Sequence, residues 1–159
     1  MWDLATHKER IERTLLPIWS LFIALIGILP LTNFVGHSHW EYIQWFPTAD
    51  NFRSWGFLFD IAANIGIFIP LGYLLSQSYP TITTGRCILL AMTVAGLLSM
   101  SIELFQVYCH NRHPSPADLL SNTTGGFIGA FLSNVRHPHK TSLPKNPTTP
   151  TQPDRSLAP

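Results

Sequence analysis

The sequence contains few charged residues. Only 12% of its 159 residues are Asp, Glu, Lys or Arg, whereas 46% are hydrophobic. A soluble domain carries charge on roughly 25% of its residues, so this chain has about half of the charge that a water-exposed surface needs. The basic residues form no patch interleaved with aromatic side chains, which argues against a nucleic-acid partner.

Cysteine is also scarce, because the chain holds only Cys87 and Cys109. If the stretch between them is a helix, they are about 33 Å apart, which is far beyond the reach of a disulfide. Four of the seven histidines lie in the loops after the first and third apolar stretches: His37, His39, His110 and His113. Their spacing matches no recognised set of metal ligands, so we expect neither a metal nor another cofactor.

Four apolar stretches are long enough to cross a membrane as helices, which requires roughly 17–25 residues. Their predicted bounds are about 15–31, 55–75, 87–107 and 117–135. The fourth stretch is the least apolar, and an amphipathic or re-entrant segment is its alternative. Gly125 and Gly129 favour a packed span, because a GxxxG pair lets helices approach closely within lipid. The predicted fold is therefore all-α, a bundle of four transmembrane helices over residues 15–135.

The basic residues predict the orientation of these helices. With both ends in the cytoplasm, only Arg53 and Arg112 of the ten Lys and Arg residues lie outside, as the positive-inside rule favours. Residues 1–14 then form a cytoplasmic N-terminus. The segment 136–159 is rich in Pro, Thr and Ser, which predicts a disordered cytoplasmic tail. This topology also predicts that a membrane-impermeant thiol reagent labels Cys109 and not Cys87.

Polar residues within the predicted spans indicate a site. An ionisable side chain at the centre of a membrane helix costs about 2.5–3.5 kcal/mol, so each one needs a partner or a role. In the predicted topology the polar side chains of the spans lie in the outer half of the membrane: Asp60, Asn64, Glu103, Gln106, Asp118 and Asn122. Arg112 lies in the loop at the same level, so we expect these residues to form one pocket near the outer face.

The role of Arg112 in this pocket has two interpretations. The guanidinium either neutralises Glu103 or Asp118, which we favour because buried charges are usually paired, or receives an anionic group of a ligand. Glu103 is the one candidate for an acid or base, although no nucleophile or metal set accompanies it.

Three polar motifs follow one another in the second, third and fourth spans. They are N-I-G-I-F-I-P-L-G from Asn64 to Gly72, S-I-E-L-F-Q from Ser101 to Gln106, and a segment that begins at Arg112 and continues as D-L-L-S-N-T-T-G to Gly125. Together they resemble the VanZ-like family. The resemblance implies that these positions carry the family motifs: Asn64, Pro70, Gly72, Glu103, Gln106, Arg112, Asp118, Asn122 and Gly125.

The resemblance implies a small multi-pass protein of the bacterial cytoplasmic membrane, similar to a factor that gives low-level resistance to teicoplanin. Three functions remain open. We favour a binding or modulating protein whose partner is a membrane lipid, a lipid-linked envelope precursor or a lipophilic glycopeptide. The alternatives are an intramembrane enzyme with Glu103 as its acid/base, acting on an anionic envelope lipid, and an assembly protein whose polar residues fix helix packing.

Overall fold

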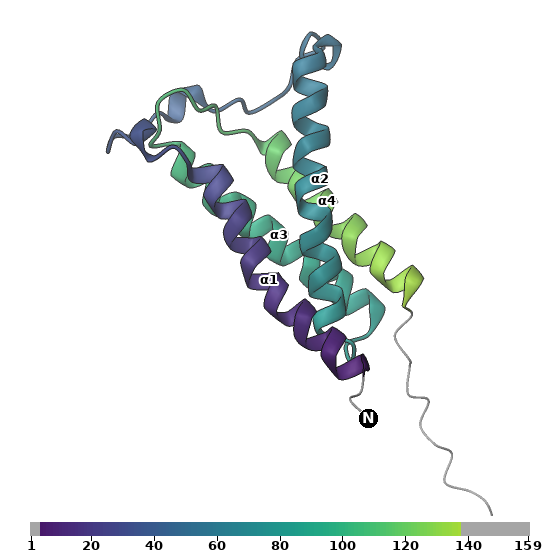
Figure 1. Cartoon of the computed structure of the whole chain (residues 1–159). Helices are drawn as coiled ribbons and strands as arrows, with labels where there is room; N and C mark the ends of the chain where they lie inside the picture. The colour runs from purple at the N-terminus through teal and green to yellow at the C-terminus, as the bar shows by residue number, and fades with distance from the viewer. Residues whose placement is uncertain (1–3, 138–159) are drawn as a thin grey trace, which may run out of the picture.

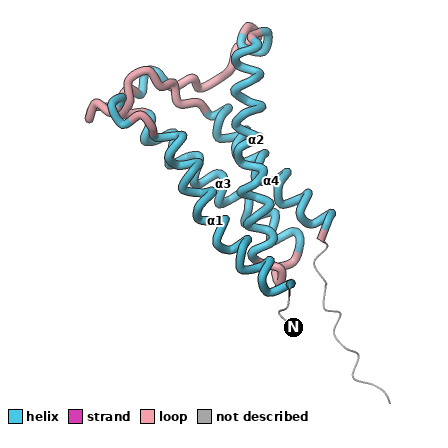
Figure 2. The backbone as a smooth tube through the Cα atoms, viewed as in Figure 1, coloured by secondary structure: helices cyan, strands magenta, loops and turns pink. Residues whose placement is uncertain are grey.

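The chain folds into four long helices. The computed structural model describes the backbone of residues 4–137 and the side chains of residues 10–137. Of the tail expected over 136–159, residues 138–159 therefore lie outside the described residues. Its α-helices are α1 (Leu4–Ile28), α2 (Trp55–Ser78), α3 (Thr84–Gln106) and α4 (Pro116–Arg136). The segment between α1 and α2 contains three short 3-10 helices, at Leu31–Asn33, Trp40–Tyr42 and Asn51–Arg53. The described residues contain no sheet (Figure 2).

The two ends of the helix bundle differ, because the long loops lie at one end only. The start of α1, the turn between α2 and α3, and the end of α4 lie at one end (Figure 1). The segments 29–54 and 107–115 lie at the other end, which we call the loop end. The first turns of α2 project beyond the neighbouring helices there (Figure 1).

Three of the helices are long and apolar enough to cross a membrane. These segments are Arg10–Ile28, Trp55–Ser78 and Thr84–Gln106. Many of their large apolar side chains are exposed on the outside of the bundle, among them Leu21, Leu89 and Leu97. Apolar surface of this extent is tolerated in contact with lipid and not in contact with water. The protein is therefore a multi-pass membrane protein.

Helix α4 is less apolar, and its small residues let it approach two other helices. A Cβ atom added at Gly129 would collide with the backbone oxygen of Ile69 and would lie 2.7 Å from the backbone nitrogen of Tyr73. On the neighbouring face, a Cβ at Gly126 would lie 2.7 Å from the Cβ of Ala95. Backbone contact of this closeness places α4 against both α2 and α3.

One glycine of α2 serves the same packing, and a proline precedes it by two residues. A Cβ at Gly72 would collide with the backbone oxygen of Gly126, so α2 also requires a glycine at the crossing. Pro70 lies inside α2 and has no N–H to donate within the helix. In the same region, the indole Nε1 of Trp19 donates to the backbone oxygen of Ile67 at 3.0 Å, which joins α1 to α2.

Candidate functional site

The polar residues that the sequence marks lie toward the loop end, but the structure distributes them over four places. Between α2 and α4, the Asn64 amide Nδ2 donates to Asp118 Oδ1 at 2.7 Å. Asp60 lies one turn earlier on α2, close enough to repel Asp118 electrostatically. The side chain of Asp60 is nevertheless exposed. Asn64 and Asp118 are thus a polar bridge between two helices, with Asp60 at its outer edge.

The start of α4 positions Asp118. Ser115 is the N-cap residue, and its Oγ accepts a hydrogen bond from the Ala117 N–H at 3.1 Å. Pro116 occupies the first turn, where the missing N–H costs nothing. Asp118 also lies in this turn, where the helix dipole favours a carboxylate. The sequence S-P-A-D, from Ser115 to Asp118, therefore forms the start of α4 and places Asp118 against α2.

Glu103 joins α3 to the same helix start. Its Oε2 accepts a hydrogen bond from the backbone N–H of Ser115 at 2.8 Å. Glu103 is half-buried, and both Arg112 and Asp118 lie within electrostatic range of its carboxylate. The hydrogen bond occupies part of the carboxylate only, because an ionised carboxylate offers about four acceptor sites.

Gln106 and Arg112 both bind the end of α1. The Gln106 Nε2 donates to the backbone oxygen of Gly27 at 2.9 Å, and the Arg112 Nη2 donates to the backbone oxygen of Leu29 at 2.7 Å. The last carbonyl groups of a helix have no partner within it, so these side chains provide one from other segments.

The ion pair that we expected for Arg112 is not found. In the described part of the chain, the ion pairs within 4 Å join Arg53 to Asp50 and His39 to Glu41. Arg112 instead uses its guanidinium on α1, because the free carbonyl oxygens at that helix end lie within its reach.

Asn122 lies deeper in the bundle, at the contact of α4 with α3. Its Nδ2 donates to the Ser99 Oγ at 2.8 Å. Both residues are buried, and the Asn122 Oδ1 has no hydrogen-bond partner in the described residues. Asn122 therefore binds α3 and is not part of the group formed by Asp118 and Asn64.

A cavity of about 220 Å³ lies beside Glu103. The first loop contributes Trp40, Ile43 and Trp45, and the remaining walls come from α3, the α3–α4 loop and the start of α4. The lining residues outside the first loop are Met100, Glu103, Leu104, Val107, Pro114, Ser115, Pro116 and Leu119. Glu103 is the one ionisable side chain among them. The surface that these residues present to the cavity is almost entirely apolar, which is typical of a site for an apolar group.

A second cavity, of about 450 Å³, lies on the α2 side of the start of α4. Trp45 and Pro116 line both cavities. The remaining wall of the second cavity is formed mainly by aromatic and aliphatic side chains of the first loop, α2 and α4. The N-terminal turn of α4 is therefore flanked by apolar space on two sides.

The sequence model of the VanZ/LLP1 family matches residues 8–137. The protein belongs to the VanZ/LLP1 family. Comparison with curated proteins and with solved structures gave no match. The matched range contains every polar residue described above, so the polar contacts at the loop end of this VanZ/LLP1 protein all lie within its family domain.

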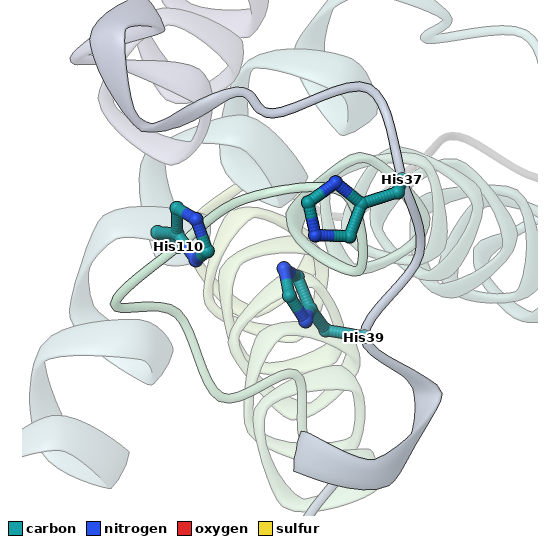
Figure 3. A group of neighbouring side chains, drawn as sticks. All are labelled: His37, His39 and His110. Atoms are coloured by element: carbon teal, nitrogen blue, oxygen red, sulfur yellow. The ribbon is translucent and has the colours of Figure 1, made fainter.

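Two features of the loops differ from what the sequence suggests. Cys109 is only 2% exposed, its Sγ lies 3.6 Å from the Phe105 backbone oxygen, and burial raises the pKa of its thiol. A buried thiol reacts slowly, so we expect the labelling of Cys109 that the topology predicts to be slow. The structure also brings His37, His39 and His110 together (Figure 3), which their spacing in the sequence does not indicate.

Proposed function

We propose that the protein crosses the bacterial cytoplasmic membrane four times, with both termini in the cytoplasm. Helix α4 supports this proposal because it carries small, buried residues toward α2 and α3 and exposed Leu120, Phe131 and Val135 on its other side. A helix of this kind can span lipid while hiding its polar residues. The described basic residues at the end opposite the loops are Arg10, Arg13, Arg86 and Arg136, against Arg53 and Arg112 at the loop end. This bias favours a loop end outside the cell.

At that outer end, the protein binds part of an amphipathic envelope molecule: a membrane lipid, a lipid-linked precursor or a lipophilic glycopeptide. The cavity beside Glu103 carries this proposal. Its volume of about 220 Å³ is below the roughly 300–1,000 Å³ of typical small-molecule pockets. It therefore suits a headgroup fragment or part of a chain, with the rest of the molecule in the bilayer.

The residues that line the cavity indicate which chemical groups it binds. The surface presented to the cavity is almost entirely apolar, which suits part of an acyl chain, while the free acceptor sites of Glu103 suit a hydroxyl or amide donor of the same molecule. Trp40 and Trp45 provide amphipathic surfaces at the membrane interface. No Lys or Arg is among the lining residues. Arg112, which would hold a phosphate in the enzyme hypothesis, is bound to Leu29. These contacts favour binding over acid/base chemistry on an anionic lipid.

Filling the cavity tests the proposal. We expect Leu104→Trp to lower the amount of lipid that copurifies with the protein by about tenfold, the loss of about 1.4 kcal/mol of binding, measured by mass spectrometry of the purified protein. Leu97→Trp is the matched control, because Leu97 lies two helical turns earlier on α3, is exposed, and lines neither cavity. Equal lipid retention by both variants would remove the cavity from consideration.

The carboxylate is tested separately. Glu103→Gln keeps an oxygen that accepts the Ser115 N–H and replaces the remaining acceptor by an amide donor. We expect this variant to fold, and to change which headgroups are retained and how the cells respond to teicoplanin. Unchanged headgroup selectivity and unchanged sensitivity would leave Glu103 with only its structural bond to Ser115.

A further inference from the structure

We propose that His37, His39 and His110 form a binding site for a divalent transition metal, with Zn²⁺ as the best fit. His37 and His39 belong to the segment between α1 and α2, and His110 belongs to the loop between α3 and α4. Figure 3 shows the three rings gathered around one space between these segments. The proposal does not depend on what occupies the cavity beside Glu103.

The distances between the rings fit metal coordination after small movements. One ligand atom from each histidine lies within 4.8 Å of the others. Around a tetrahedral Zn²⁺ with Zn–N bonds of about 2.0–2.1 Å, neighbouring nitrogen atoms are about 3.3 Å apart. The ligand atoms therefore have to move together by about an ångström to reach the separation in a zinc site. His37 and His110 are exposed, so rotation of their rings can produce this movement.

His39 provides an independent sign of a ligand. Its side chain is only 9% exposed, and its Nε2 is buried without a hydrogen-bond partner in the described residues. A buried nitrogen without a partner is unfavourable, and a metal ion would use its lone pair.

The other side of the same ring is oriented as in known metal sites. The His39 Nδ1 lies 3.4 Å from Glu41 Oε1, and the ring stacks on Tyr42 at a centroid distance of 5.0 Å. A carboxylate that accepts the Nδ1–H fixes the tautomer with the lone pair on Nε2, which is the usual arrangement of a metal-bound histidine.

Backbone hydrogen bonds hold the two histidine segments together. The His39 N–H donates to the Val107 oxygen at 2.8 Å, and the His110 N–H donates to the Asn33 oxygen at 2.7 Å. Between them, the Val35 N–H donates to Tyr108 at 3.0 Å. The ligands therefore do not depend on the metal to find one another, which lowers the entropy cost of binding.

The ligand set selects the metal and leaves one position open. Three neutral imidazoles suit Zn²⁺, Cu²⁺ or Ni²⁺ and do not suit Mg²⁺ or Ca²⁺, which prefer oxygen. A tetrahedral site with three protein ligands has a fourth position for water or a ligand atom. Because Val107 and Trp40, the neighbour of His39, both line the cavity beside Glu103, a bound metal would also stiffen one wall of that cavity.

The test uses the full chain in detergent, purified with a tag that contains no histidine. We expect calorimetric titration with Zn²⁺ to give one site per chain. His37→Ala and His110→Ala should each weaken binding by more than about 100-fold, since loss of an outer partner alone costs about 10–100-fold. Both side chains are exposed, so these substitutions leave the helix packing intact, as gel filtration would verify.

Two further variants make the assignment specific. Glu41→Gln should weaken Zn²⁺ binding by about 10–100-fold, as expected for an orienting partner. His113→Ala is the matched control, because His113 lies in the same loop as His110, contacts the Tyr42 ring and is not part of the cluster. Its Zn²⁺ affinity should equal that of the unsubstituted protein.

Titration with Co²⁺ gives a second readout, because tetrahedral coordination produces strong visible absorption bands that free Co²⁺ lacks. These bands should appear in the unsubstituted protein and in His113→Ala, and should be lost in His37→Ala and His110→Ala. The proposal is overturned if Zn²⁺ affinity is the same in all variants, or if His113→Ala loses as much affinity as the cluster variants.

Discussion

Gly129→Ala is expected to weaken the packing of α4 on α2. The added Cβ would collide with the backbone oxygen of Ile69 and would lie 2.7 Å from the backbone nitrogen of Tyr73. An ordinary van der Waals contact begins at 3.4 Å, so even the longer of the two contacts is short by about 0.7 Å. Both contacted atoms belong to the backbone of α2. No side-chain rotation relieves the collision, so the helices have to move apart.

The size of the effect follows from two opposing terms. Overpacking of a filled interior typically costs about 1–3 kcal/mol, and a backbone collision lies at the upper end of that range. Alanine recovers about 0.5–1 kcal/mol of helix stability relative to glycine. The net loss is therefore about 2 kcal/mol. For a chain of this size, each kcal/mol lowers the melting temperature by about 2–4 °C, so we expect a decrease of about 4–8 °C.

Thermal unfolding in a mild detergent, followed by circular dichroism, measures this decrease. Gly66→Ala is the matched control, because Gly66 lies in α2 and a Cβ there would meet nothing within 4 Å. This variant gains helix propensity without a collision, so its melting temperature should stay the same or rise. If both variants melt at the same temperature, α2 and α4 do not approach as closely as described.

The remaining predictions concern topology and buried polar contacts. In a background without native cysteines, Phe46→Cys, at a side chain that is 87% exposed, should react with an impermeant maleimide in intact cells. Arg86→Cys should react only after permeabilisation, and the reverse pattern would invert the topology. Native Cys109 should react slowly even from the loop side, because it is 2% exposed and burial raises its thiol pKa; rapid, complete labelling would contradict its burial. Asn122→Ala and Ser99→Ala should each lower the melting temperature, with a coupling of about 0.6–1.7 kcal/mol in a double-mutant cycle, and strictly additive effects would exclude their hydrogen bond.

Hydropathy was sufficient to predict α1, α2 and α3, because a helix that faces lipid must be apolar over its whole length. The bounds were less predictable. The predicted first span is 15–31, whereas α1 begins at Leu4 and ends at Ile28. The earlier start arises because a helix can extend beyond the apolar stretch, and the earlier end because Pro30 disfavours helix at the residue before it. Helix α4 falls below the hydropathy of the other three. Its glycines, and not its hydropathy, indicate that it packs within the bundle.

The sequence was sufficient to predict at which end of the bundle the polar residues lie, but it did not predict which partners they bind. Helical spacing places Asp60 and Asn64 on one face of α2, and it says nothing about which neighbouring helix faces them. Asn64 binds Asp118, whereas Asp60 stays exposed. The partner of Arg112 was equally unpredictable. Arg112 binds the backbone oxygen of Leu29 instead of a carboxylate, and this contact depends on where α1 ends.

By itself, the sequence determined that this is a helical membrane protein of the VanZ-like type, because apolar length and ordered motifs are local properties of the chain. Only the tertiary structure decided which loops meet. His37 and His39 are separated from His110 by two complete helices in the sequence, and backbone hydrogen bonds between the segments bring them together. Contacts of this kind depend on how the helices pack and on the directions in which the loops leave them, and the spacing of residues along the chain does not indicate either.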